Sequence, residues 1–310
     1  MLFEFTRLKK SMLVQDHLFF KSYVDRLEEE IVKQVYGVIG NPIGHSLSPA
    51  MLEAAFKELN IDATYVAFEV KEDQLKRAID GVRSLGIKGL NVTIPHKVAV
   101  MEYLDEIDPL AKQLGAVNTI VNKDNKLIGY NTDGEGYLEA ILPILPKALK
   151  EMRVLILGAG GAAQGVALTM AIHGVKEMCI SNRTVYKAEE LAKACSSLTT
   201  ASSLPITLAQ ARLTEFDLII NTTSIGMTPN VDQMPLSLEM IARGAVVSDL
   251  IYTPSKTRWL KDAEARGAII QNGLEMFVNQ GAIAFEKWTG KRAPRKVMKK
   301  EVVDKLGGTI

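Results

Sequence analysis

Short apolar runs alternate with amphipathic stretches along the chain from residue 36 onward. An apolar run that ends in glycine or proline predicts a buried strand, whereas apolar residues at three- and four-residue spacing predict a helix. In the first half of the chain this pattern predicts strands at 36–40, 64–70, 89–95, 116–121 and 126–130, and helices at 48–59, 72–85 and 96–104. Strands that alternate with helices are typical of an α/β domain with a largely parallel sheet.

A second α/β unit is expected after a connecting helix at 134–145. Its predicted strands are 153–157, 177–181, 217–221, 245–250 and 268–270, and its predicted helices are 162–173, 186–194, 259–266 and 275–288. The length of 310 residues agrees with two domains at about 150 residues each. Residues 1–35 are interpreted as an N-terminal extension, with one amphipathic helix at 23–32.

The charge balance argues against a polyanionic partner. Lys and Arg number 37 and Asp and Glu number 36, so the net charge is +1. Nucleic acids and anionic membranes favour a large basic excess, so we expect neither as a partner. No uninterrupted run of about 18 apolar residues predicts a membrane span. Two cysteines and four scattered histidines indicate neither a disulfide framework nor a metal site, and a cytoplasmic location is the simplest interpretation.

The clearest chemical signal is a glycine-rich turn between the strand at 153–157 and the helix that follows it. Gly158, Gly160 and Ala163 match the pattern G-x-G-x-x-A. The first glycine permits a tight turn, the second lets the backbone approach a pyrophosphate, and the alanine allows close helix–strand packing. The free N–H groups at the start of the helix then favour phosphate. This segment predicts a dinucleotide-binding site; a bare structural turn is the alternative.

The end of the next strand indicates which dinucleotide is bound. NAD-binding units carry an acidic residue there for the ribose 2′-hydroxyl. Here the strand ends in Ser181-Asn182-Arg183-Thr184, and Lys187 lies one helical turn further. A guanidinium binds a 2′-phosphate through two parallel N–H groups, whereas a carboxylate would repel it. We therefore expect NADP; solvated surface charges are the alternative interpretation of Arg183 and Lys187.

Polar residues also follow the strands of the first unit, in the loops 41–49, 91–97, 115–119 and 129–134. Loops beyond the carboxyl ends of strands are where α/β sheets bind ligands. Their hydroxyls, amides, one ammonium and one carboxylate suit a small, polyhydroxylated, anionic ligand. None of these runs alone identifies the substrate.

Taken together, the motifs resemble one family, the shikimate dehydrogenases, which include quinate/shikimate dehydrogenases. The resemblance extends from about residue 36 to about residue 290. The runs that carry it are GNPIGHSLSP (40–49), NVTIPHK (91–97), GAVNT (115–119), GYNTDG (129–134), GAGGAA (158–163), NRT (182–184), NTTSIGM (221–227) and GLEMFVNQGAIAF (273–285).

The resemblance implies the reaction 3-dehydroshikimate + NADPH ⇌ shikimate + NADP⁺. Lys97 and Asp133 match the family's catalytic pair, and Ser46 with Ser48 matches the pair that binds the substrate carboxylate. The remaining matches on the substrate side are Asn91, Thr93, Asn118 and Gln280 as ring-hydroxyl contacts, and Tyr252. The expected cofactor residues are Gly158, Ala159, Gly160, Gly161, Ala162, Asn182, Arg183, Thr184, Lys187, Thr222, Ser224, Met227, Gly273 and Met276.

The expected architecture is an N-terminal α/β substrate domain and a Rossmann-type NADP-binding domain with a cleft between them. Because the 275–288 helix resembles a segment that packs back on the first domain, we expect that domain to be discontinuous. It comprises 36–133 plus 273–310, and the NADP-binding domain comprises 134–272. The resemblance is compatible with a monomer or a homodimer.

Structural interpretations of the same residues remain open. Ser48 is expected to cap the 48–59 helix, with Pro49 at its first position. Asn91 and Asn118 could bond local backbone groups, Lys97 could be solvated, and Asp133 could form a turn. The alternative functions are a quinate-preferring or dual-specificity enzyme, a non-catalytic nucleotide-binding protein, and a methylene-tetrahydrofolate dehydrogenase.

Overall fold

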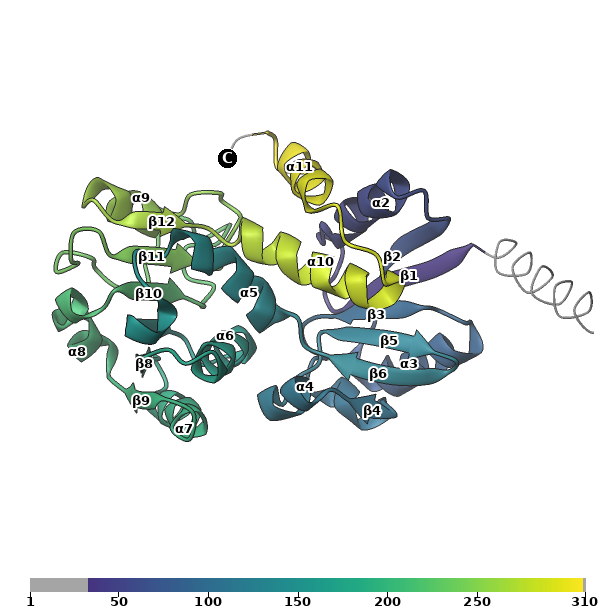
Figure 1. Ribbon diagram of the computed structural model, residues 1–310, viewed down its shortest axis with the longest axis horizontal. Helices are drawn as coiled ribbons and strands as arrows, with labels where there is room; N and C mark the ends of the chain where they lie inside the picture. Colours follow the sequence, from purple (N-terminus) through teal and green to yellow (C-terminus); the bar gives the residue numbers. More distant parts are fainter. Residues whose placement is uncertain (1–32, 309–310) are drawn as a thin grey trace, which may run out of the picture.

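The computed structural model describes residues 33–308. Two α/β domains lie side by side and are joined by two helices, α5 (Asp133–Ile141) and α10 (Leu274–Thr289) (Figure 1). Each domain is built around a six-stranded sheet. The predicted two-domain α/β fold is confirmed. The predicted helix at 23–32 lies outside the described residues. Gln34 and Val35 belong to the first strand and not to the N-terminal extension predicted over 1–35.

The first sheet is mixed. Its order is β2 (Ala63–Glu69), β1 (Gln34–Gly40), β3 (Gly89–Val92), β5 (Thr119–Lys123), β6 (Lys126–Tyr130) and β4 (Glu106–Ile107). β5 runs antiparallel to β3 and β6, and the other strands share one direction. β5 and β6 form a hairpin that turns at Asp124 and Asn125, which both have positive φ, the geometry that tight hairpin turns require.

Alternation along β1 divides the first domain into two cores. Tyr36 and Val38 pack on one face against α2 (Ser48–Glu58), α10 and α11 (Arg295–Lys305). Ile39 faces the opposite side, against α3 (Leu75–Ser84) and the 3₁₀ helix η2 (Ala99–Tyr103). The C-terminal helices thus cover a sheet formed near the other end of the chain.

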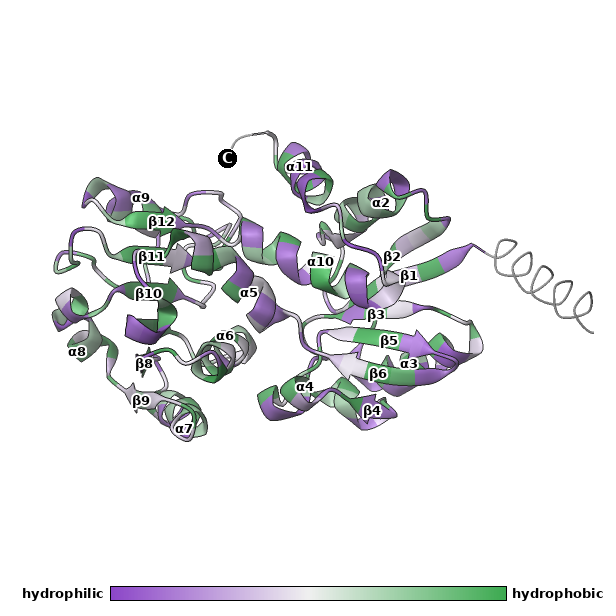
Figure 2. Cartoon of the chain, in the orientation of Figure 1, coloured by the Kyte–Doolittle hydropathy of each residue, from purple (hydrophilic) through white to green (hydrophobic). Residues whose placement is uncertain are grey.

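The second sheet is entirely parallel, in the order β12 (Ile269–Gln271), β11 (Val246–Asp249), β10 (Leu218–Asn221), β7 (Arg153–Leu157), β8 (Glu177–Ser181) and β9 (Thr200–Ser203). This arrangement, with the first strand of the domain at the centre, is the doubly wound order of a Rossmann fold. Figure 2 shows β10 mostly in the hydrophobic colour, as expected for a strand buried on both faces. The helices are α6 (Gly161–Ile172), α7 (Val185–Cys195), α8 (Ile206–Ala211) and α9 (Arg258–Ala265).

Three local predictions are wrong. The strand predicted at 89–95 ends at Val92, and the helix predicted at 96–104 is a turn followed by η2. The backbone of this segment forms hydrogen bonds to other parts of the first domain instead. The Lys97 carbonyl accepts from Val117 N at 2.8 Å, and Thr93 N donates to the Ile39 carbonyl at 3.0 Å. Ser48 is already helical, so the cap position falls on Leu47, where no side chain accepts a hydrogen bond.

Candidate functional site

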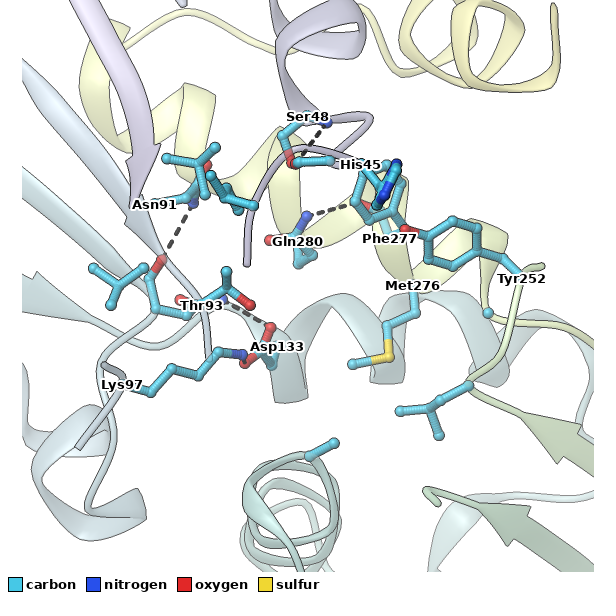
Figure 3. Close-up of a pocket in the computed structure, with 18 of the residues that line it drawn as sticks. His45, Ser48, Asn91, Thr93, Lys97, Asp133, Tyr252, Met276, Phe277 and Gln280 are labelled. Carbon is cyan, nitrogen blue, oxygen red and sulfur yellow. Dashed lines mark hydrogen bonds and ion pairs between the residues drawn. The ribbon is translucent and has the colours of Figure 1, made fainter. Parts of the chain in front are cut away.

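A cavity of about 470 Å³ lies where the carboxyl ends of the two sheets meet. Loops after β1, β3 and β6 line it from the first domain, and the end of β11 and the first turn of α6 line it from the second. Figure 3 shows side chains converging on this space from both sides. The predicted catalytic and substrate residues all line it: Ser46, Ser48, Asn91, Thr93, Lys97, Asn118, Asp133, Tyr252 and Gln280.

Lys97 and Asp133 form an ion pair in the wall of the cavity (Figure 3). Lys97 Nζ lies 2.7 Å from Asp133 Oδ2, and the side chains are 25% and 14% exposed. Asp133 is the first residue of α5, so the start of a helix sets its position. A half-buried ammonium held by a carboxylate can donate a proton to a developing oxyanion. The resulting amine can then be reprotonated by way of the carboxylate.

Asn118 fixes the other carboxylate oxygen. Its Nδ2 donates to Asp133 Oδ1 at 2.8 Å, and its Oδ1 accepts from the backbone N–H of Thr132 at 2.8 Å. The Thr132 hydroxyl in turn donates to the Gln280 carbonyl at 3.0 Å. These bonds connect the end of β6, the start of α5 and the middle of α10.

Asn91 also lines the cavity, and its amide is oriented by the residues behind it. Its Nδ2 donates to Thr119 Oγ1 at 3.2 Å and to the Asn118 carbonyl at 3.3 Å. Its Oδ1 accepts from the Tyr65 hydroxyl at 2.6 Å. Sequence reasoning missed Tyr65. A tyrosine within a buried strand is the available signal, because a buried phenol usually requires a hydrogen-bond partner.

Ser46 and Ser48 lie beside the N-terminus of α2. Ser48 N donates to Ser46 Oγ at 3.3 Å, and Ser48 is 7% exposed. The free N–H groups and positive dipole end of a helix favour an anion at this place. Two hydroxyls beside that helix end form a suitable site for a carboxylate.

Tyr252 and Gln280 also line the cavity, and both are held by Phe277. Tyr252 stacks on Phe277 with ring centroids 5.0 Å apart, and Gln280 Nε2 donates to the Phe277 carbonyl at 2.8 Å. Burial raises the pKa of Tyr252, so its hydroxyl keeps its proton and can donate to a ligand.

The glycine-rich turn has the space that a pyrophosphate requires. Gly158 has a φ of +117°, and a Cβ there would overlap the Thr222 hydroxyl. A Cβ on Gly160 or Gly161 would meet nothing within 4 Å, and Gly160 directly precedes α6. The bare backbone at this helix start can therefore approach a phosphate, and the residues present fit the dinucleotide that the motif predicts.

The other predicted cofactor residues lie at the carboxyl edge of the same sheet. Arg183 and Lys187 are exposed after β8, and neither has an ion-pair partner within residues 33–308. Two unpartnered cations close together in sequence suit a phosphate. Ala162, Gly273 and Met276 line the cavity itself. Gly158, Ala159, Gly160 and Gly161 follow β7; Asn182 and Thr184 follow β8; Thr222, Ser224 and Met227 follow β10.

Neither a metal cluster nor a membrane-spanning helix is found in the part of the chain that the structure describes. No group of three or more His, Cys, Asp or Glu side chains there could hold a metal ion. No helix within those residues is both long and apolar enough to cross a membrane.

Comparison with known proteins gives matches along most of the chain. Three family models match: the shikimate dehydrogenase substrate binding domain at residues 38–120, shikimate / quinate 5-dehydrogenase at 141–235, and the shikimate 5′-dehydrogenase C-terminal domain at 273–303. The chain is 54% identical over 277 residues to the shikimate dehydrogenase (NADP(+)) of Bacillus cereus (strain ATCC 10987 / NRS 248). That alignment covers 89% of this chain and 100% of the relative.

Solved structures of shikimate dehydrogenases are also similar to this chain. A shikimate dehydrogenase crystallised in complex with NADP⁺ is 45% identical with a TM-score of 0.83, over 88% of this chain and 96% of that chain. The shikimate 5-dehydrogenase of Thermus thermophilus, in complex with NADP(H) and shikimate, is 33% identical with a TM-score of 0.80. That match covers 87% of this chain and 99% of the other.

Proposed function

The chain belongs to the shikimate dehydrogenase family, and its activity is the NADP-dependent interconversion of 3-dehydroshikimate and shikimate; we propose that Lys97 and Asp133 carry its proton chemistry. One observation supports this most directly. The Lys97–Asp133 pair, joined at 2.7 Å, lines the cavity that the substrate domain shares with the first turn of α6. Acid–base groups thus lie between a site for a polar anion and a site for a dinucleotide.

The residues of this chain act on the substrate oxygen. When bound, the nicotinamide supplies the hydride donor for reduction and the hydride acceptor for oxidation. Reduction builds negative charge on the ketone oxygen, and the Lys97 ammonium stabilises it and assists its protonation. Asp133 holds the ammonium through Oδ2, while Asn118 holds Asp133 through Oδ1. The two residues act as a coupled pair.

The substrate is oriented by its carboxylate and its hydroxyls. Ser46 and Ser48 bind the carboxylate at the start of α2. The ring hydroxyls are contacted by Asn91, Thr93, Asn118 and Gln280, and Tyr252 donates a further hydrogen bond. Because such a set combines donors and acceptors around a small ring, it favours a polyhydroxylated acid over an apolar ligand.

The cofactor is held by the second domain. Gly160 and Gly161 present their N–H groups to the pyrophosphate, and Arg183 with Lys187 binds the 2′-phosphate. Thr222, Ser224 and Met227 follow the neighbouring strand β10, and Gly273 with Met276 extends toward the cavity. The site is compatible with a cytoplasmic enzyme of small molecules; the expectation of a monomer or homodimer rests on the family resemblance.

Lys97→Ala tests the proposal. Loss of an acid–base group lowers kcat by about 10²–10⁴. We expect that loss in oxidation of shikimate by NADP⁺, followed by absorbance of the reduced nicotinamide, with unchanged NADP⁺ affinity in direct binding. Lys76→Ala is the matched control, since Lys76 is also paired to an aspartate, Asp80, at 2.8 Å but on an exposed helix face. It should retain wild-type kcat.

The same assay on the unsubstituted protein compares shikimate with quinate and NADP⁺ with NAD⁺. We expect the highest kcat/KM with shikimate and NADP⁺. A higher kcat/KM with quinate would show that quinate is the preferred substrate. A higher kcat/KM with NAD⁺ would contradict the proposal that Arg183 and Lys187 bind the 2′-phosphate. A near-normal kcat in Lys97→Ala would exclude the proposed role of Lys97.

A further inference from the structure

We propose that Tyr65 is a positioning residue for the substrate site: its hydroxyl, acting through Asn91 and Thr119, orients Asn118 and Asp133. This inference rests on the proposed function of that site. Tyr65 does not line the cavity, so it acts through its neighbours and not by touching a ligand.

The Tyr65 ring is held in one place. The residue is 2% exposed, and its ring packs against Trp288 with centroids 6.1 Å apart. Trp288 is itself fixed by donation from Nε1 to the Ile120 carbonyl at 2.9 Å. The Tyr65 hydroxyl reaches Asn91 Oδ1 at 2.6 Å. Burial raises the pKa of Tyr65 well above its usual range, so this hydroxyl remains a donor.

The hydrogen bonds from Tyr65 to Asp133 all point in one direction. Tyr65 donates to Asn91, Asn91 donates to Thr119 Oγ1 at 3.2 Å, and Thr119 donates to Asn118 Oδ1 at 3.0 Å. Asn118 Nδ2 then donates to Asp133 Oδ1 at 2.8 Å. A chain of aligned donors strengthens each member, because every bond polarises the next.

Two backbone groups make this direction obligatory. The Thr132 N–H can only donate, so Asn118 must turn Oδ1 toward it and Nδ2 toward Asp133. A flipped Asn91 amide would place Oδ1 against the Asn118 carbonyl, which now accepts from Asn91 Nδ2 at 3.3 Å. The orientations of both amides are therefore fixed, because a backbone N–H can only donate and a backbone carbonyl can only accept.

The orientation of the Asn91 amide determines which atom it can offer to a ligand. Both Asn91 amide hydrogens are committed to the protein, so the atom that Asn91 can offer a ligand is Oδ1. That oxygen already accepts one hydrogen bond from Tyr65 and has one lone pair left. Asn91 therefore acts as an acceptor and selects a ligand hydroxyl that donates.

Tyr65→Phe removes the hydroxyl and keeps the ring. Leaving a positioned amide without its donor is expected to raise KM for shikimate about 10-fold, with a smaller fall in kcat and unchanged KM for NADP⁺. Tyr36→Phe is the matched control. Tyr36 is equally buried at 2% and its ring lies 5.3 Å from Trp288, but its hydroxyl donates to Gln34, at 2.9 Å, away from the site. It should leave KM for shikimate within twofold of the unsubstituted protein.

The inference is overturned if Tyr65→Phe leaves KM for shikimate within twofold, or if Tyr36→Phe raises it as much. If Tyr65→Phe folds poorly, a second pair of variants tests the same hydrogen-bond chain. Thr119→Val removes the hydroxyl and should raise KM for shikimate, whereas Thr119→Ser keeps the hydroxyl and should restore the original KM. Equal values for the two would also overturn the inference. Absence of shikimate oxidation by the unsubstituted protein would instead refute the proposed function, so the two failures are distinguishable.

Discussion

A buried carboxylate behind the cavity shows how single residues organise the loops of the second domain. Asp249, at the end of β11, is 0% exposed. It accepts from Thr257 Oγ1 at 2.8 Å, from Asn221 Nδ2 at 3.0 Å and from Ile251 N at 3.1 Å. These partners belong to the start of α9, the end of β10 and the segment leading to Tyr252. One side chain thus joins the loop that carries Tyr252 to the loop that begins with Thr222.

The cost of burying this charge should be visible in the pH dependence of stability. Burial raises the pKa of Asp249 from 3.8 to about 6, because the hydrogen bonds offset only part of the desolvation. Between about pH 4 and pH 6 the folded state keeps a proton that the unfolded chain has lost, so rising pH favours unfolding. At about 1.4 kcal/mol per pKa unit, the contribution of this group to the free energy of unfolding falls by about 3 kcal/mol across that range.

Asp249→Asn removes the titrating group and retains an oxygen for Asn221 and Ile251. Urea unfolding of both proteins at several pH values from about 4 to about 7 gives the difference in free energy of unfolding, unsubstituted minus variant. We expect this difference to fall by about 3 kcal/mol as the pH rises. A difference that stays constant or rises would show that Asp249 is ionised at no cost in the folded protein.

At this scale, sequence identified the residues of the cavity but not those behind them. Lys97, Asp133 and the other lining residues fall in contiguous motifs, most of them at the end of a predicted strand. Tyr65 carries no such motif. It reaches Asn91 because β1 pairs with both β2 and β3, and that register is a property of the folded sheet. Hydrogen-bond partners set by strand pairing cannot be read from local pattern.

At the scale of elements, the packing of α5 positions the Lys97–Asp133 ion pair, because Asp133 is the first residue of this helix. Glycines allow its close approach to two neighbours. A Cβ on Gly134 would overlap Thr169 of α6, and a Cβ on Gly136 would lie 2.7 Å from Gln280 N and 2.9 Å from Gln280 Cα. The second clash is with helix backbone, which cannot rotate away.

Gly136→Ala should therefore push α5 away from α10. Overpacking of this kind costs about 1–3 kcal/mol of stability, and displacement of Asp133 should lower kcat. Gly81→Ala is the control, since Gly81 lies inside α3 and its added Cβ would meet nothing within 4 Å. That change should stabilise the protein by about 0.5–1 kcal/mol and leave kcat unchanged. Urea unfolding and steady-state kinetics measure both effects; a neutral Gly136→Ala would show that the interhelical contact is not tight.

Elements with a clear apolar pattern were predictable from the sequence, whereas the charge-rich helix α11 was not. The strands β7 and β8 lie at the residues expected from their apolar runs. α11 was not predicted, because its sequence RKVMKKEVVDK is dominated by charge. Its two buried side chains, Met298 and Val302, pack in the core that includes α2, and this contact is not evident from the local sequence. The turn at 96–98 looks helical in sequence, but the Lys97 carbonyl accepts a hydrogen bond from Val117 N, outside the segment, and this contact competes with that preference.

At the scale of the whole molecule, the chain crosses between domains twice, so one core is assembled from both ends of the described sequence. Val278, Phe285 and Met298 pack with Tyr36 and Phe56. Trp259 belongs to a separate core, formed by β7, β10, β11, α8 and α9. If the predicted division into 36–133 plus 273–310 and 134–272 is right, the two domains should unfold as separate cooperative units. Each core should control the opening of its own sheet.

Phe285→Ala and Trp259→Ala test that claim as a pair. Both side chains are 0% exposed, and truncation of a buried aromatic costs about 3–5 kcal/mol. Native-state hydrogen exchange, read at the strand amides, should show faster exchange in β1 and β3 for Phe285→Ala, with β7 and β10 little changed. Trp259→Ala should show the reverse, since cooperative units open with their own free energies. If either variant accelerated exchange equally in both sheets, the domains would unfold as one unit. The C-terminal segment would then belong to a single core, and the division at 133 and 273 would be wrong.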